Sequence, residues 1–131
     1  MINYAVFEAK VMKQMKHPNL LGIDFVMLTP HDISLVVPFS DGGDLREFHR
    51  KVYKYDDGFD EEMVLFYAIQ LISAVGYLQD RRIIHRDIKM ANTLISKDGY
   101  LKLCDFGLAK KMEAGEKTNK FCGTTKTMAP E

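Results

Sequence analysis

The first segment of the chain repeats its apolar side chains at the interval of an amphipathic helix. Phe7, Val11 and Met15 lie four residues apart, and most positions between them are lysine, glutamine or glutamate. This spacing puts the apolar side chains on one helix face and predicts a helix from about residue 3 to residue 16. Pro18 ends the helix, because the residue before a proline disfavours helical backbone.

Two pairs of strand-like apolar runs predict two β-hairpins. Residues 23–28 and 34–39 flank a short polar loop. Residues 93–96 and 100–104 flank Asp98-Gly99, a dipeptide typical of tight hairpin turns.

Two further helices follow from capping residues and apolar spacing. Asp44, with Glu47 three residues later, resembles a capping box and predicts a short helix from residue 45. A long helix is expected from about residue 60 to residue 79. Because its apolar residues cover nearly all faces, other elements must enclose it. Residues 107–131 have no periodicity and predict a long functional loop. These elements together indicate the α+β class.

Composition narrows the function classes. The chain has 131 residues, 47% of them apolar, and 18 Lys and Arg balance 18 Asp and Glu. The charge balance excludes a protein that binds nucleic acid or anionic membranes through its overall charge. The sequence leaves the oligomeric state open. The uninterrupted apolar runs are far shorter than the ~18 residues of a membrane span. Without a secretory signal, we expect an intracellular, cytoplasmic protein, with the nucleus not excluded. The histidines and cysteines have no zinc-ligand spacing, so we expect no structural metal.

The open end of the second hairpin predicts a place for a metal ion. Asn92 lies six residues before Asp98, and Asp105 lies six after Gly99, so we expect their side chains about 5 Å apart. A carboxylate and an amide oxygen suit Mg²⁺, which takes few protein ligands. Taken alone, the pair is better explained as a polar hairpin base without a ligand.

The segment before this hairpin carries further chemistry. Its sequence HRDIKMAN places an acid, Asp87, and a cation, Lys89, within five residues of Asn92. Here the chain resembles the eukaryotic protein kinase family, whose catalytic loop this segment matches. Residues 105–107 match the family's metal-binding DFG motif, and residues 129–131 match the APE motif that closes its activation segment. Three such motifs in order are a specific signal.

The resemblance implies transfer of a phosphoryl group from ATP, with Mg²⁺, to Ser or Thr hydroxyls of a protein substrate. Asp87 would orient the hydroxyl, Lys89 would neutralise the γ-phosphate, and Asn92 and Asp105 would hold Mg²⁺. The implied catalytic residues are thus Asp87, Lys89 and Asn92, and the implied metal ligands are Asn92 and Asp105. The implied cofactor-binding residues are Val37, Pro38, Phe39, Ser40, Asp44, Leu94 and Asp105. For Asp44, a ribose contact and the helix cap are equally favoured.

The resemblance also assigns residues that support the site. Glu8 would be the helix glutamate that pairs with an ATP-positioning lysine. Met12, Ile23, His85 and Phe106 would form the family's regulatory spine. Lys89 and Thr124 resemble the serine/threonine branch of the family more than the tyrosine branch.

Two departures from the family lie in the long loop. Lys120 occupies the position that is often the phosphothreonine, and a lysine there would repel Arg86, which commonly pairs with that phosphate. We therefore expect any activating phosphate on Thr118, or none to be needed. Residues 125–127 read Thr-Lys-Thr where the family has Pro-x-Tyr, which puts the substrate platform in doubt.

The resemblance gives the chain an incomplete bilobal kinase fold, with part of the small lobe and the first half of the large lobe. Residues 1–37 are the small-lobe remnant, 38–44 the hinge, and 45–131 the start of the large lobe with the catalytic loop and activation segment. No Gly-rich loop or strand lysine precedes Glu8, so we expect the 131 residues alone to be inactive.

Three functions remain open from the sequence. The leading one is part of a serine/threonine protein kinase domain. The second is a truncated, pseudokinase-like interaction module without catalysis. The third is a small-molecule phosphotransferase with a kinase-like fold.

Overall fold

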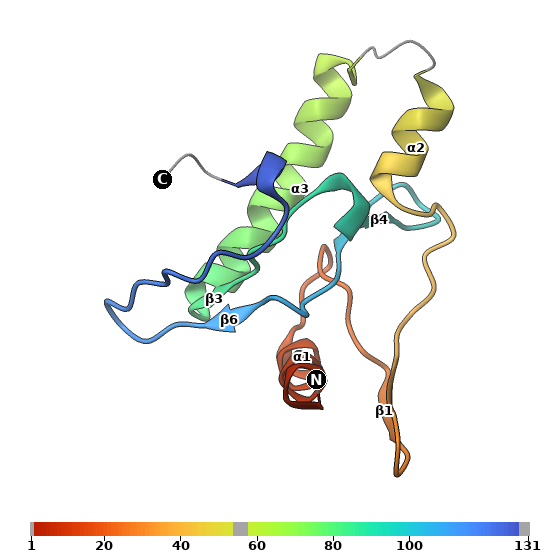
Figure 1. Ribbon diagram of the computed structural model, residues 1–131. Coiled ribbons are helices and arrows are strands. Elements are labelled where there is room, and N and C mark those ends of the chain that lie inside the picture. The colour runs from red at the N-terminus through yellow and green to blue at the C-terminus, as the bar shows by residue number, and fades with distance from the viewer. Residues whose placement is uncertain (1, 54–57, 129–131) are drawn as a thin grey trace.

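Helices and short antiparallel sheets share the chain, which confirms the α+β class (Figure 1). The computed structural model describes residues 2–53 and 58–128, so the predicted APE motif lies outside the described residues. The helices are α1 (Ile2–Gln14), α2 (Leu45–Val52) and α3 (Glu61–Asp80), with 3₁₀ turns η1 (Met90–Asn92) and η2 (Thr125–Thr127). The two-stranded sheets pair β1 (Phe25–Leu28) with β2 (Ile33–Val36), β3 (Ile83–Ile84) with β6 (Lys110–Lys111), and β4 (Thr93–Ile95) with β5 (Leu101–Leu103).

Aspartate caps fix the starts of α2 and α3. The Asp44 carboxylate accepts the Glu47 N–H at 2.8 Å, and the Asp60 carboxylate accepts the Met63 N–H at 2.8 Å. Each bond satisfies an amide that has no partner within the first turn of its helix. Both helix starts predicted from the sequence are therefore confirmed.

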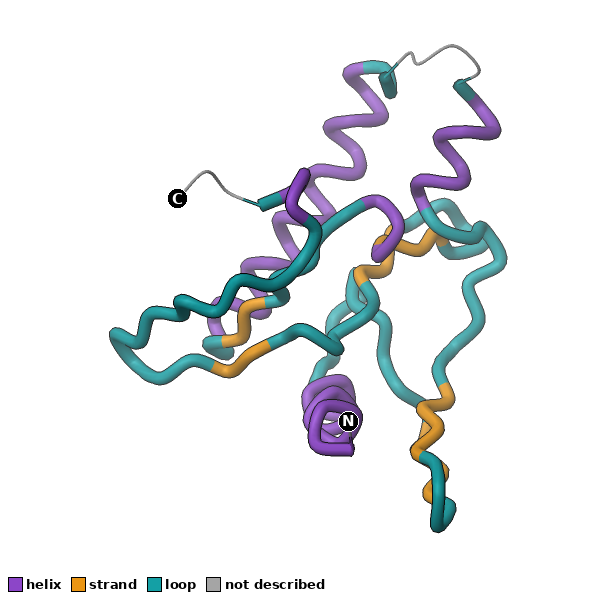
Figure 2. The backbone as a smooth tube through the Cα atoms, in the orientation of Figure 1, coloured by secondary structure: helices purple, strands orange, loops and turns teal. Residues whose placement is uncertain are grey.

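One apolar core joins segments that are distant in sequence. Its buried members come from α1, the segment after it, α3 and β5, and they include Met12, Leu21, Leu78 and Leu103. Phe106, fully buried, belongs to the same core. Figure 2 shows the chain after β6 running as a long loop back toward α3. The core thus holds the residues around β5 in place between two helices.

The helix α3 has a packed face and an exposed face. Ala74 and Leu78 are almost fully buried, whereas Leu65, Ile69 and Ile72 are 56–70% exposed. By length and composition, α3 is the one helix in the described part of the chain that could cross a membrane, with a mean hydropathy of 1.3. Core helices of soluble proteins meet the same criterion.

The β4–β5 hairpin differs from its predicted register by one residue. Thr93 pairs with Leu103, and the Cys104 N–H donates to the Asn92 carbonyl at 2.9 Å. Asn92 therefore lies opposite Cys104, and the prediction that it lies opposite Asp105 is wrong. The cause is the loop: residues 97–99 form a three-residue connection that ends in Gly99 at φ 87°, instead of the two-residue turn assumed.

Candidate active site

The predicted catalytic segment, residues 85–92, crosses between β3 and β4 and is held by hydrogen bonds at its C-terminal end. The Asn92 N–H and the Thr93 hydroxyl both donate to the Lys89 carbonyl at 3.0 Å. The Asn92 carbonyl accepts from Cys104, which ties this end to the β4–β5 hairpin. These bonds fix the backbone from which the Lys89 and Asn92 side chains project.

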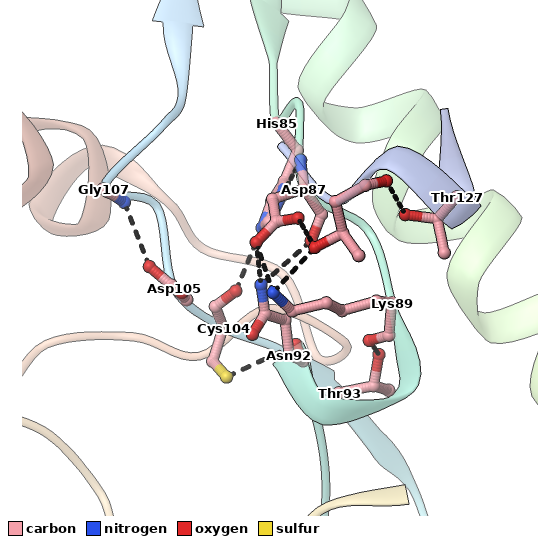
Figure 3. Close-up of polar contacts among 10 residues, drawn as sticks. His85, Asp87, Lys89, Asn92, Thr93, Cys104, Asp105, Gly107 and Thr127 are labelled. Carbon is pink, nitrogen blue, oxygen red and sulfur yellow. Dashed lines mark hydrogen bonds and ion pairs between the residues drawn. The ribbon is translucent and has the colours of Figure 1, made fainter. Parts of the chain in front are cut away.

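The Asp87 carboxylate is the centre of the polar network (Figure 3). One oxygen accepts from Lys89 Nζ at 2.7 Å and from Asn92 Nδ2 at 2.9 Å. The other accepts from Thr124 Oγ1 at 2.7 Å. Lys89 Nζ also donates to Thr124 Oγ1 at 3.0 Å. The three predicted catalytic residues therefore meet in one cluster.

The network keeps Asp87 ionised although its side chain is buried. Burial raises the pKa, but the bonds from Lys89, Thr124 and Asn92 outweigh it and hold the pKa of Asp87 at about 2. Because this pKa lies below its ordinary value, the charged form contributes stability at neutral pH that is lost as the pH falls toward 2. The group stays an acceptor of hydrogen bonds at every physiological pH.

His85 supports this segment as a neutral ring. Its Nε2 lies 3.0 Å from the Cys104 carbonyl, and the Asp87 N–H donates to Nδ1 at 3.3 Å. Since Nδ1 accepts, the proton belongs on Nε2, which donates to Cys104. Burial lowers the pKa of His85, in agreement with the neutral form. Its ring packs edge-on against Phe106, with centroids 5.0 Å apart.

Asp105 lies one residue beyond the last hairpin pair. Its backbone is left-handed, at φ 62°, and its exposed carboxylate points toward the Gly107 N–H, 3.4 Å away (Figure 3). A Cβ added to Gly107 would lie 3.3 Å from this carboxylate and 3.8 Å from that of Glu8. The Glu8 and Asp105 carboxylates therefore flank the same glycine.

The electrostatics of Glu8 reflect that placement. Burial and then the charge of Asp105 raise the pKa of Glu8, and a hydrogen bond from the Phe106 N–H works in the opposite direction. Two carboxylates near each other favour a cation between or beside them. Glu8 thus lies beside residues 105–107, which match the family's DFG motif, and its pairing with a lysine stays a prediction.

The predicted nucleotide residues divide into packed and exposed ones. Val37 and Leu94 are half-buried and pack against the main core. Phe39 is 88% exposed, Pro38 is exposed and Ser40 is half-buried. An isolated antiparallel backbone bridge places Asp44 beside Leu94. The Asp44 side chain caps α2, so the cap interpretation is confirmed and the ribose contact stays a prediction.

Cys104 borders the same region as an unreactive thiol. Its Sγ donates to the Asn92 carbonyl at 3.3 Å. Burial raises the pKa of Cys104 to about 11, with Asp105 adding to the effect. A thiol with such a pKa is protonated at neutral pH and is a poor nucleophile.

Thr124 is a site residue that the predicted set lacks. It lies 37 positions from Asp87 in the sequence, so no local spacing predicts their hydrogen bond. Its neighbour Gly123 has φ 104°, and a side chain there would collide with the Arg86 carbonyl oxygen. The resemblance to the serine/threonine branch already marked Thr124, and the glycine directly before it, in a loop without periodicity, is the signal for this close approach.

Comparison with known proteins agrees with the geometry. The protein kinase domain family matches residues 2–131. The chain belongs to the protein kinase family. It is 36% identical to serine/threonine-protein kinase akt-1 of Caenorhabditis elegans, over 99% of this chain and 24% of that protein. It is 34% identical to the human RAC-beta serine/threonine-protein kinase, over 99% of this chain and 26% of that protein.

These matches confirm the kinase-like fold and the resemblance to serine/threonine kinases. The chain spans about a quarter of the length of these relatives. The mixed helices and small antiparallel sheets agree with part of a bilobal kinase fold. The division into lobes and hinge stays a prediction.

One cation beside the long loop is only partly hydrogen-bonded within the described residues. Arg86 donates through Nε to the Leu108 carbonyl at 2.6 Å, but its buried Nη1 has no hydrogen-bond partner within the described residues. A cavity of about 420 Å³ beside it is also lined by Thr118 and Lys120. Lys120 thus shares the cavity with Arg86, as the sequence suggested, and the described residues that line it include these two cations and no carboxylate.

This cavity supports the prediction about Thr118. A phosphate on Thr118 would give Arg86 the anionic acceptor that Nη1 lacks. Mass spectrometry of the active, complete kinase is expected to find the activating phosphate on Thr118, or no phosphate in residues 117–128. Phosphate on another residue of this loop in the active protein, with Thr118 unmodified, would contradict the prediction.

Proposed function

We propose that the complete protein containing this segment transfers the γ-phosphate of ATP to Ser or Thr hydroxyls of protein substrates. The observation that carries the proposal is the ionised Asp87 carboxylate, held by Lys89, Asn92 and Thr124. Phosphoryl transfer depends on positioning and charge neutralisation, and this cluster supplies both. The serine/threonine kinases among its relatives support the same activity.

The proposed reaction uses Asp87 to place the acceptor. The substrate hydroxyl oxygen attacks the γ-phosphorus, and the bond to the bridging oxygen breaks as ADP leaves with its electron pair. The hydroxyl proton passes to the Asp87 carboxylate. With a pKa of about 2, this carboxylate is a weak base. Its main role is therefore to orient the substrate hydroxyl. It takes the proton late, because the hydroxyl becomes more acidic as its oxygen bonds to phosphorus.

Lys89 and Thr124 complete the acceptor side. The Lys89 ammonium lies 2.7 Å from Asp87 and 3.0 Å from Thr124 Oγ1. From there it can neutralise charge on the transferring phosphate. Thr124 fixes the second Asp87 oxygen and attaches the activation segment to the catalytic loop. A substrate lying on this segment would present its hydroxyl beside Asp87.

The donor set fits a magnesium ion on the nucleotide side. The Asn92 hydrogen bonds use Nδ2, so its amide oxygen stays available, and the Asp105 carboxylate is exposed. The described residues contain no group of three or more His, Cys, Asp or Glu side chains suited to a metal. Mg²⁺ takes few protein ligands and completes its coordination shell with water and phosphate oxygens. Mg²⁺ would supply charge neutralisation of the phosphates.

The experiment uses the complete protein, γ-labelled ATP and Mg²⁺. Peptides that differ only in Ser, Thr or Tyr at the acceptor position serve as substrates. We expect label on Ser and Thr, none on Tyr, and none after a chelator removes the metal. Label on a small molecule alone would favour the phosphotransferase alternative, and bound ATP without any transfer would favour the interaction module.

A further inference from the structure

The part of the activation segment nearest the catalytic cluster carries positive charge alone. Residues 117–128 contain three lysines and no Asp or Glu. Of the two acids just before them, Glu116 accepts from Lys110 Nζ at 2.5 Å and from the Glu113 N–H at 2.8 Å. This acid is therefore engaged away from the catalytic cluster.

Lys126 is the lysine best placed to meet a substrate. It lies in η2, the 3₁₀ turn directly after Thr124. The Thr127 N–H and hydroxyl both donate to the Thr124 carbonyl, at 2.9 and 3.0 Å, and fix the turn. Because a 3₁₀ turn rises about 2 Å per residue, Lys126 stays within a few ångströms of Thr124 along the chain. Its side chain is exposed.

The length of the Lys126 side chain determines which substrate residues it can contact. Thr124 Oγ1 lies 2.7 Å from the carboxylate that receives the substrate hydroxyl. A lysine stem two residues farther on can place its ammonium beside a substrate residue one or two positions from the acceptor. The group that would recognise this ammonium is a carboxylate.

The acids of the site have other partners. Asp87 accepts bonds from Lys89, Asn92 and Thr124. Asp44 caps α2, and Asp105 is the proposed metal ligand. None of the three is thus positioned to draw a basic substrate residue to the Lys126 side of the acceptor.

We propose that the protein prefers Ser or Thr hydroxyls with an Asp or Glu within two positions, and that Lys126 is the residue that selects them. This inference rests on the proposed kinase function and adds its substrate class. Exposed ion pairs are worth at most about 1 kcal/mol, so the preference is expected to be roughly fivefold in kcat/KM.

The test measures kcat/KM of the complete protein on three Ser peptides. They are identical except for Glu, Ala or Arg within two positions of the acceptor. We expect the Glu peptide to exceed the Ala peptide roughly fivefold, and the difference to shrink at high salt, because exposed charges are screened. Lys126→Glu is expected to reverse the order of the Glu and Arg peptides.

Lys97→Glu is the matched control. Lys97 is also exposed but lies in the β4–β5 turn, so this variant is expected to keep the wild-type order. A second variant, Lys126→Gln, removes the charge alone and is expected to abolish the preference. If the protein transfers phosphate without preferring the Glu peptide, the inference is overturned and the kinase function stands. The same holds if the Glu preference survives Lys126→Glu. No transfer to any peptide overturns both.

Discussion

Asp87→Asn is expected to lower kcat for phosphoryl transfer by roughly 10²- to 10⁴-fold. The asparagine cannot take the hydroxyl proton. Its amide group would also face the Lys89 and Asn92 donors, which now bind one carboxylate oxygen. The Kd for ATP is expected to change little, because Asp87 lies on the acceptor side of the transferred phosphate. Steady-state kinetics and nucleotide titration measure the two effects separately.

Asp98→Asn is the control for this substitution. The Asp98 carboxylate also accepts a side-chain hydrogen bond, from Ser96 at 2.6 Å, and that bond lowers its pKa. It lies in the β4–β5 turn, however, and is exposed. We expect Asp98→Asn to retain wild-type kcat. An Asp87→Asn variant that also retains it would show that Asp87 does not act in the reaction.

Phe106→Ala is expected to lower the free energy of unfolding by about 3–5 kcal/mol. The ring is fully buried, packs against His85 and belongs to the core shared by α1, α3 and β5. Its removal leaves a cavity under the catalytic segment and takes away the support of His85, which in turn accepts the Asp87 N–H. Urea unfolding of the complete protein, followed by near-ultraviolet circular dichroism, measures the change.

Phe39→Ala is the control for burial. This side chain is 88% exposed, so its loss is expected to change the free energy of unfolding by less than about 0.5 kcal/mol. Equal effects of the two substitutions would contradict the assignment of Phe106 to the core. Since both remove the same ring, burial is the variable that differs between them.

Local signals explain what the sequence could predict. Asp44 and Asp60 cap helices whose starts they also predict, because a cap acts within three residues. The hairpin at Gly99 was expected from its dipeptide, but the register depended on the loop length. Asp98-Gly99 serves two-residue and three-residue loops alike, and the three-residue loop moved Asp105 out of its pair with Asn92.

Contacts between residues distant in sequence could not be predicted from such local signals. Gln70 Oε1 accepts from the Leu101 N–H at 2.8 Å and from Asn19 Nδ2 at 3.0 Å, which joins three separate segments in the interior. Gln70 shares the periodicity of the packed α3 face, but no residue near it in the sequence indicates that it bonds to Leu101 and Asn19. The Thr124 bond to Asp87 is of the same kind. Such contacts form only when the fold brings distant segments together.

A single-turnover measurement on the complete protein tests the central claim most directly. The protein is loaded with γ-labelled ATP and Mg²⁺, the bound nucleotide is quantified, and a Ser peptide is then added in excess. The account predicts that wild type passes the bound γ-phosphate to the peptide, whereas Asp87→Asn binds ATP and retains it. Wild-type protein that binds ATP but transfers no phosphate would contradict the account and favour the interaction module.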